Sequence, residues 1–494
     1  MLTIYCDKEG QEKVNQILSS VEELTGLYRL LSTTKKSFAP KNPYLKAEKD
    51  LIQWPIDWHN SEPPILFRPQ VLNEQNLLCM VFAKIGHYDL ALRYQSDPTL
   101  FSTVQQLASL IQGQEHLSLS SGEEFFERHN AAIIQHYTNI RLNGDSLTSY
   151  YQGAIDHAPD TEYEVFSAKH YATYLSDMGE ILEAKNLLTS ILAKTISKEA
   201  EISIKFDLID ILMAQLTIPY DTKLVGQLKE LISECLDYYE STSLEVRIAM
   251  LLVQASEIAN IDGSYAESMK YINRAITIYE SEQISEFLAQ AFLRKGTLLY
   301  TWAQNGNPQF YKGAIETYQE ALKTFKKETF PSVFAEIHHN LGVIYAEAPA
   351  EDKQRSMWAA VSATSFKESL ECYTKEDHPY AYAMVCNNYA NALVKYPPAK
   401  NSDNVEKAIH LYHEALEIRT ADNYPLERAH TLLNYLEACW RVNNVNETME
   451  RVRCNDMELK AREVKELTID QNLHEQAEEH LDKLKDLRKV LILS

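Results

Sequence analysis

Asparagine recurs at one position of three similar segments in the second half of the chain. Asn340, Asn388 and Asn434 each stand directly before a large apolar residue. Asparagine is a mediocre helix former that prefers caps and turns, so its repetition inside helical segments needs a reason. An amide both donates and accepts hydrogen bonds, and a column of amides can therefore bond a peptide main chain whatever its sequence. Alternatively, the amides tie adjacent helices together.

Polar and aromatic residues near this column are candidates for the same surface. Arg294 takes the place of the asparagine one repeat earlier, and Thr297, Tyr300 and Glu437 are neighbouring candidates. Each amide bond contributes only about 0.5–1.5 kcal/mol net, so side-chain pockets must supply the rest of the affinity. The candidate partner-binding residues are Arg294, Asn340, Asn387, Asn388, Asn391, Asn434, Trp440 and Arg441.

The sequence offers no comparable case for catalysis or metal binding. His410 and His413 are three residues apart and could be drawn with Glu414 as ligands, but no HExxH motif or placed third group accompanies them. We therefore interpret the histidine pair as polar surface. The chain has no Walker loop, GxGxxG or GxSxG motif. No catalytic residue, cofactor or metal is expected, and we predict a protein without enzymatic activity.

The composition favours helices. Only 14 glycines occur in 494 residues, under half of the roughly 7% of average proteins, which argues against many tight turns and against Gly-rich phosphate loops. The hydrophobic fraction of 45% and the 29 tyrosines provide material for a large core, so the chain is not a disordered polymer.

Charge and cysteine content restrict the partners and the compartment. The formal net charge of −22 disfavours nucleic acid and anionic membranes, because binding to phosphates needs clustered Lys and Arg. A basic peptide would be electrostatically favoured, although an acidic surface is more often a solubility feature. Seven scattered cysteines without a CxxC fit reduced thiols. Without a signal peptide or a long apolar run, we expect a soluble, cytoplasmic protein.

Three helix pairs repeat between 291 and 418. The second helix of each pair carries a small, an aromatic and a small residue at i, i+4 and i+7, and a small residue recurs in each first helix. A small residue at a fixed place lets two helix axes approach, while the ring fills the neighbouring groove. The triplets are Ala314/Tyr318/Ala321, Ser362/Phe366/Ser369 and Ala408/Tyr412/Ala415, and the small residues of the first helices are Gly296, Gly342 and Ala390.

These segments resemble the tetratricopeptide repeat (TPR), a helix–turn–helix of about 34 residues that stacks into a solenoid. The resemblance covers residues 72–445 and implies an all-α fold, a right-handed superhelix of about nine antiparallel helix pairs with a concave face that holds a peptide. The spacing is longer than usual, with 46 residues from Gly296 to Gly342 and 48 from there to Ala390. Such extended repeats resemble those of bacterial TPR proteins that accompany signalling or protease modules.

The departures from the family pattern lead to two further expectations. Extra residues at 302–310, 348–358 and 395–404 are predicted to be loops between the two helices of each pair, where they could form a partner-binding rim or have no role. The Lys-plus-Asn carboxylate clamp of chaperone-binding TPR proteins is missing, since the equivalent places hold His339 and Asn387. Binding of a chaperone's C-terminal carboxylate is therefore disfavoured.

The two ends differ from the repeats. Residues 1–37 are predicted to be a helical segment with a helix over 11–34 after a short strand, and residues 38–71 a Pro-rich extended connector lying on the first helices. Residues 446–494 are predicted to form a capping helix. Its apolar stripe is Leu473, Ala477, Leu481, Leu484, Leu487 and Leu491.

The leading hypothesis is a non-enzymatic adaptor or regulator that binds a peptide or partner protein in the concave groove of the solenoid. One alternative is a structural scaffold that forms homo-oligomers through the C-terminal helix. Another is an enzyme, or the regulatory subunit of one, with chemistry in residues 1–120, where the repeat is weakest. The sequence does not name the partner.

Overall fold

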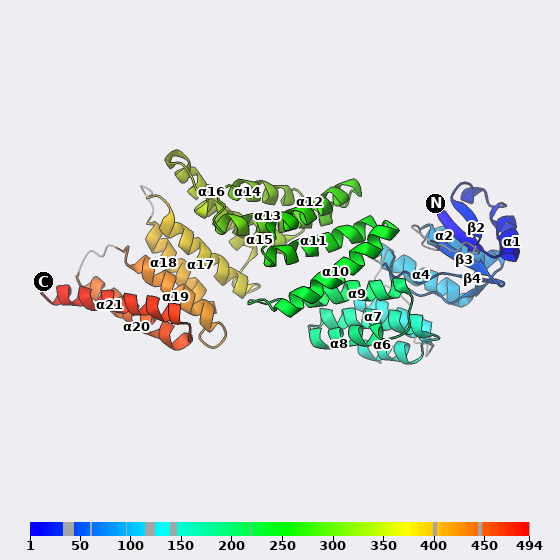
Figure 1. Ribbon diagram of the computed structural model, residues 1–494, viewed down its shortest axis with the longest axis horizontal. Coiled ribbons are helices and arrows are strands. Elements are labelled where there is room, and N and C mark those ends of the chain that lie inside the picture. Colours follow the sequence, from blue (N-terminus) through cyan, green and yellow to red (C-terminus); the bar gives the residue numbers. More distant parts are fainter. Residues whose placement is uncertain are drawn as a thin grey trace. The chain divides into compact units, whose positions relative to one another are not determined.

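A computed structural model describes residues 1–32, 44–59, 62–94, 96–113, 124–138, 146–217, 219–398, 403–442 and 447–493, the last four by their backbone alone. Parts of the Pro-rich connector and of the predicted loop at 395–404 lie outside these residues. The chain divides into two compact units, Met1–Ser268 and Met269–Ser494, which we call unit 1 and unit 2. Helices dominate both units, and the fold is an all-α helical repeat preceded by one small sheet (Figure 1).

Unit 1 begins with a five-stranded sheet in the order β2-β1-β3-β4-β5. Strands β1 and β2 pair in parallel with Leu2 opposite Tyr28, and β3 and β4 form an antiparallel hairpin. Helix α1 covers the sheet core through the buried Val14 and Leu18. The elements are β1 (Leu2–Cys6), α1 (Lys8–Leu18), the 3-10 turn η1 (Glu22–Leu24), β2 (Tyr28–Ser32), β3 (Tyr44–Glu48), β4 (Leu51–Gln53) and β5 (Gln70–Val71).

The sheet corrects the expectation of a helical segment at 1–37, and the strands β3, β4 and β5 replace parts of the extended connector expected over 38–71. Residues 54–59 and 62–69 form neither helix nor strand, as expected of the connector. The short strand at residues 2–6 is present, but the helix ends at Leu18 and β2 follows it. Lys49 and Asp50 both have positive φ, 50° and 58°, and join β3 to β4. Hairpin turns of this kind usually contain Gly or Asn, so a Lys-Asp turn gives no sequence signal.

The helices of unit 1 follow the sheet and pack on one another in sequence order. They are α2 (Glu74–Lys84), α3 (Tyr88–Ala91), α4 (Pro98–Gln112), α5 (Phe125–Tyr137), α6 (Leu147–Asp156), α7 (Thr161–Asp177), α8 (Ile181–Leu192), α9 (Lys198–Ala214), α10 (Thr222–Thr242) and α11 (Glu245–Ile261). Helix α12 (Tyr265–Ser281) crosses the boundary between the two units.

Unit 2 contains the predicted repeats and the C-terminal helices. Three helix pairs pack tightly, α13 with α14, α15 with α16 and α17 with α18, and α19 packs on the last of them. The elements are α13 (Ser285–Gln304), α14 (Phe310–Ala321), α15 (Pro331–Glu347), α16 (Asp352–Cys372), α17 (Pro379–Lys395), α18 (Asn404–Ile418), α19 (Pro425–Cys439), α20 (Glu447–Leu467) and α21 (Gln471–Leu493).

The predicted packing of rings against small residues is confirmed. A Cβ atom added to Gly296 would lie 2.9 Å from the ring of Tyr318, and one added to Gly342 would lie 3.0 Å from the ring of Phe366. The small–aromatic–small triplets of the second helices are all buried. Close approach of the two helices in a pair therefore depends on the missing side chain, as in TPR helix pairs.

The extra residues of the long repeats are not all loops. Helix α16 begins at Asp352, so most of the segment predicted as a loop at 348–358 is helical and lengthens the helix at its N-terminal end (Figure 1). Asp352 is followed by Lys, Gln, Arg, Ser and Met without Gly or Pro, a run that permits helix. Helix α13 likewise continues to Gln304. A rim made of three stacked loops is therefore wrong for this part of the repeat.

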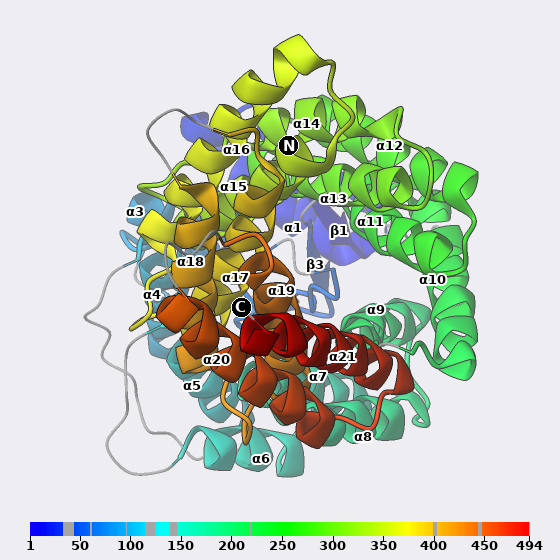
Figure 2. The same cartoon turned by 90° about the vertical axis from the view of Figure 1, so that its left-hand side faces the viewer.

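The C-terminal region is a hairpin of two helices instead of one capping helix. Helices α20 and α21 lie side by side (Figure 2) and pack on α19. The break falls at 468–470, where Asp470 accepts hydrogen bonds from the backbone N–H groups of Asn472 and Leu473. Leu473, Ala477 and Leu484 are buried, so much of the predicted apolar stripe packs inside the hairpin.

Among the described residues, no helix combines the length and the apolar character needed to cross a membrane.

Candidate partner-binding site

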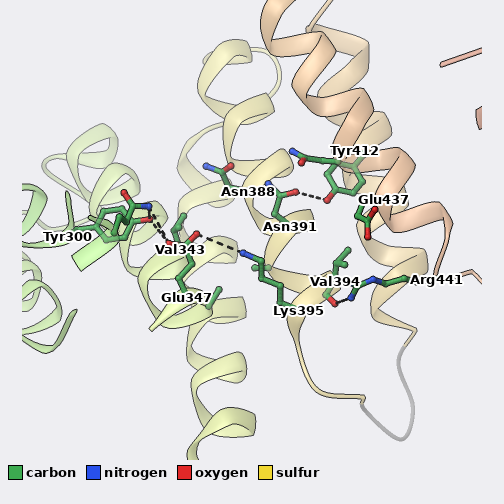
Figure 3. A pocket seen from close by; sticks show the side chains of 14 residues that line it. Tyr300, Val343, Glu347, Asn388, Asn391, Val394, Lys395, Tyr412, Glu437 and Arg441 are labelled. Carbon is green, nitrogen blue, oxygen red and sulfur yellow. Dashed lines mark hydrogen bonds and ion pairs between the residues drawn. The ribbon is translucent and has the colours of Figure 1, made fainter. Parts of the chain in front are cut away.

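Unit 2 contains a cavity of about 410 Å³ formed by α13, α15, α17, α18 and α19. It is referred to as the cavity from here on. Figure 3 shows the side chains around it. Four of the eight candidate residues, Asn388, Asn391, Asn434 and Arg441, line it together with the neighbouring candidates Tyr300 and Glu437. The other lining residues are Gln304, Val343, Ala346, Glu347, Ala392, Val394, Lys395 and Tyr412.

Asparagine amides connect three consecutive first helices. The Nδ2 atom of Asn388 on α17 lies 2.9 Å from Nε2 of His339 on α15, and Asn387 donates to the Oδ1 atom of Asn388 over 3.1 Å. Asn434 on α19 donates to Asn387 over 3.3 Å. His339 is buried, and desolvation lowers its pKa to about 4, so its ring is neutral near pH 7. The amides thus join adjacent helices while two of them also face the cavity.

A second amide on α17 is fixed by a tyrosine of the partner helix. The hydroxyl of Tyr412 on α18 donates to the Oδ1 atom of Asn391 over 2.6 Å. Tyr412 is buried, and burial raises the pKa of its hydroxyl, so it remains a donor. Because the oxygen of Asn391 is bonded, the orientation of this amide is set. Among the described residues, its Nδ2 group has no hydrogen-bond acceptor.

Two acidic and two basic groups line the cavity. Glu347 accepts hydrogen bonds from the hydroxyl of Tyr300 over 3.0 Å and from Gln304 over 3.3 Å, and it lies 4.0 Å from the ammonium group of Lys395. Arg441 donates to the carbonyl oxygen of Val394 over 2.8 Å. The acidic groups are Glu347 and Glu437, and the basic groups are Lys395 and Arg441, so the lining has no excess of either sign.

The other four candidate residues lie outside the cavity lining. Asn340 lies beside the hydroxyl of Tyr318, and the exposed Arg294 lies near the same ring. Asn387 is buried between Asn388 and Asn434. Trp440 donates from Nε1 to Nδ1 of His480 over 2.8 Å, with the two rings stacked at 6.4 Å. Trp440 therefore holds α21 against the end of α19.

The sequence analysis missed Glu347 and Lys395. These two residues and Arg441 each stand seven positions after an asparagine of the column, at 340, 388 and 434. Positions i and i+7 lie on the same face of a helix two turns apart. A charged column at this spacing therefore continues the asparagine column along the first helices, and the spacing was a usable sequence signal.

Histidine and cysteine side chains are the other groups of unit 2 that could form a site. The ring of His413 packs at 5.1 Å from Tyr435. Among the described residues, no group of three His, Cys, Asp or Glu side chains is placed to hold a metal ion. All seven cysteines are free thiols, and six of them are buried. Burial raises the pKa of Cys386 to about 12 and that of Cys439 to about 11, so these thiols stay protonated.

Several solved structures are distantly similar to this chain. A STAND signal transduction ATPase with a tetratricopeptide repeat sensor from Pyrococcus horikoshii matches with 10% identity, over 99% of this chain and 78% of that chain, at a TM-score of 0.47. Yeast Tom70 matches with 11% identity, over 84% and 82% of the two chains, at a TM-score of 0.37. The TPR domain of P58(IPK) matches with 14% identity, over 84% and 99%, at 0.23. No family model and no curated protein matches the sequence.

These TM-scores are too low to assign a function by similarity. The helical repeat fold rests on the packing of the chain itself, in which the rings of Tyr318 and Phe366 cover Gly296 and Gly342. The interpretation of the site rests on the geometry of the cavity.

Proposed function

We propose that this protein is a non-enzymatic adaptor or regulator whose cavity in unit 2 binds an extended segment of a partner protein. The proposal rests on one observation. The amides of Asn388, Asn391 and Asn434 line the same cavity as the charged column of the first helices. Amides suit a peptide main chain because each can donate to a carbonyl oxygen and accept from an N–H group.

The hydrogen bonds already present determine what each amide offers. The oxygen of Asn391 accepts from Tyr412, so its Nδ2 group is the part that would donate to a ligand carbonyl. Within the described part of the chain, the Asn434 amide makes one long bond of 3.3 Å, to Asn387, which a ligand could replace at little cost. Asn388 is bonded to His339 and serves as the fixed member of the column.

The charged side chains would select ligand side chains. Glu347 and Lys395 are 4.0 Å apart, and partly exposed pairs of this kind contribute about 0–1 kcal/mol. A ligand with one acidic and one basic side chain can therefore replace this ion pair with two of its own, one to Lys395 and one to Glu347. The net charge of −22 favours a basic partner at long range, whereas the mixed lining of the cavity itself favours a segment with both signs.

The experiment compares partners captured from cell lysate by the wild-type chain and by the double variant Asn434→Ala/Arg441→Ala. Both residues line the cavity, and Arg441 is exposed, so the melting temperature should change little. Lys312→Ala is the matched control, because this lysine is an exposed charge of unit 2 outside the cavity. The proposal expects at least one partner retained by the wild type and the control and lost by the double variant. Equal retention by all three proteins contradicts it.

The C-terminal hairpin fits a capping role within this proposal. Its buried side chains, including Met457 and Ala477, pack against one another and α19. A terminal repeat needs such a cover, because the face that would meet the next repeat is apolar. Self-association through α21 would have to use the residues that remain exposed, which include many charged groups.

A further inference from the structure

One surface of the helices of unit 1 is covered by a segment of the chain itself. Residues 54–59 and 62–67, together called the strap below, lie between strands β4 and β5, and these residues form neither helix nor strand. Trp58, Leu66 and Phe67 in this segment are buried at 5%, 4% and 2% exposure. An irregular segment this deeply buried must have partners for its backbone polar groups.

Side chains of α5 bind the backbone of the strap at its C-terminal end. The N–H group of Leu66 donates to Oδ1 of Asn130 over 2.8 Å, and Nδ2 of Asn130 donates to the carbonyl oxygen of Leu66 over 2.9 Å. One amide thus satisfies both backbone groups of one residue. Nε2 of His129 lies 2.9 Å from the carbonyl oxygen of Pro64. These contacts are to the main chain, so they do not depend on the identity of Pro64 or Leu66.

Helices α7, α9 and α11 bind the other end of the strap. Ser203 on α9 donates to the carbonyl oxygen of Trp58 over 2.5 Å, and Nε of Arg247 on α11 donates to that of His59 over 3.0 Å. The ring of Trp58 meets Phe166 on α7 edge to face at 5.2 Å. The strap therefore crosses α5, α7, α9 and α11, with polar bonds to its backbone and one aromatic anchor.

Asn130 has a sequence context like that of two asparagines of the column in unit 2. It stands two positions before Ala132, as Asn340 stands two before Gly342 and Asn388 two before Ala390. A histidine precedes both Asn130 and Asn340. Unit 1 thus shows, within the same chain, a helix asparagine bonding an irregular main-chain segment.

We propose that the surface of α5, α7, α9 and α11 beneath the strap is a second peptide-binding groove, and that the strap occupies it as an intramolecular ligand that an extended partner segment with an aromatic anchor can displace. The inference does not rest on the function of the cavity in unit 2, because it concerns other residues. A tethered ligand competes at a high effective concentration, so the groove is closed until the strap is released.

A second observation indicates that the strap is an imperfect ligand. His170 on α7 is 2% exposed, and neither of its ring nitrogens has a hydrogen-bond partner among the described residues. Its ring lies 4.7 Å from that of Phe166 and 6.2 Å from that of His129, both of which meet the strap or its backbone. Burial and the nearby Lys169 lower the pKa of His170, which keeps it neutral. A ligand that supplies a polar group to His170 would bind better than the strap does.

The test uses the full chain and a fluorescein-labelled synthetic peptide with the sequence of residues 53–68 as the probe. Trp58→Ala removes the anchor from the strap but leaves the groove intact, and Asn130→Ala removes the main-chain contact of the groove. Trp302→Ala is the matched control, because Trp302 is a buried tryptophan of unit 2, at 3% exposure. Fluorescence anisotropy measures binding of the probe.

We expect the Trp58→Ala chain to bind the probe at least about tenfold more tightly than the wild type, because the tethered competitor is weakened. The Trp302→Ala chain and the Trp58→Ala/Asn130→Ala chain should bind it no better than the wild type does. Binding of the probe to Trp58→Ala at wild-type strength, with native helix content by circular dichroism, overturns the proposal.

If the Trp58→Ala chain does not fold, hydrogen exchange on the wild-type chain tests whether the strap can be displaced. A displaceable strap opens without unfolding the helices beneath it, so the amide of Leu66 should exchange at least about tenfold faster than the amides in the middle of α5 and α9. Exchange of Leu66 at the same rate as these helices would show that the strap is an inseparable part of the core and would overturn the proposal.

Discussion

The amide nitrogen of Asn388 lies 2.9 Å from Nε2 of His339, and this hydrogen bond joins the first helices of two consecutive repeats. The bond agrees with the alternative in which the amides tie adjacent helices together, and Asn388 also lines the cavity. The bond fixes the amide at the cavity wall through a neutral, buried imidazole. The first helices are therefore coupled to one another through the same side chains that are proposed to meet the partner.

The His339–Asn388 bond predicts a dependence of stability on pH. Desolvation lowers the pKa of His339 from 6.5 to about 4, so between these values the unfolded chain binds a proton that the folded chain does not. Stability is therefore fully present above about pH 6.5 and falls as the pH drops toward 4, by at most about 1.4 kcal/mol per pH unit for this group. His339→Gln keeps a polar group and cannot titrate, so it should lose less stability than the wild type between pH 7 and pH 5.

Urea unfolding at several pH values measures this difference. The exposed His410, changed to Gln, is the control and should follow the wild type. Because desolvation also lowers the pKa values of His59 and of the buried His129 to about 4, both chains will retain some loss of stability in acid, and the prediction concerns the difference between them. Parallel losses for His339→Gln and the wild type would contradict it.

Gly342 sets the distance between α15 and α16. A methyl group on it would lie 3.0 Å from three ring carbons of Phe366, so Gly342→Ala should destabilise unit 2 by about 1–3 kcal/mol through overpacking. Gly313→Ala is a matched control within a helix, where the added methyl group meets only Leu299 at 3.4 Å. Since alanine is the better helix former, the control should be neutral or stabilising by up to about 1 kcal/mol. Equal melting temperatures for the two variants would show that the close approach is unimportant.

The hydroxyl of Tyr412 holds Asn391 in the cavity. Tyr412→Phe removes this 2.6 Å bond and should cost about 0.5–1.5 kcal/mol of stability. Tyr435→Phe removes a similar 2.7 Å bond to Asp456, which is not part of the cavity lining. We expect both variants to lose similar stability, measured by thermal melting, while only Tyr412→Phe loses a captured partner. A partner lost equally from both would point to stability alone.

Deletion of residues 446–494 distinguishes between a capping role and an oligomerisation role of the C-terminal hairpin. The hairpin covers α19, so its loss should expose apolar side chains such as Leu432 and Leu436 and lower the melting temperature of the remaining chain. Light scattering on the full chain should give the mass of a monomer. A full-length dimer that becomes a stable monomer on truncation would instead support the self-associating scaffold.

The repeats were predictable because their signal is local and periodic. Small residues and rings at fixed spacing identified the pairs around Gly296 and Gly342, and the packing follows that pattern. The same regularity located the asparagine column. Four of the eight residues predicted to bind a partner line the cavity. Glu347 and Lys395 follow Asn340 and Asn388 by seven positions, so the sequence also carried the signal for these two lining residues.

The N-terminal region was not predictable in the same way. The β3–β4 turn at Lys49 and Asp50 requires positive φ at two residues that rarely signal a hairpin. The parallel pairing of β1 with β2 joins residues 26 positions apart, which composition cannot reveal. The extra residues before Trp358 lengthen α16, because they contain no residue that stops a helix. They were predicted to be a loop because the apolar stripe of α16 begins only after them.

The most direct test of the central claim is site-specific cross-linking from the cavity. Glu437 is exposed and lines the cavity, so a photo-cross-linking p-benzoyl-phenylalanine at this position should join the chain to its captured partner on irradiation. The same group at Lys312, which is exposed and outside the cavity, should give no such product. Cross-links from position 437 alone, mapped to one short partner segment, are the predicted result. Cross-links from position 312 with none from 437 would contradict the account.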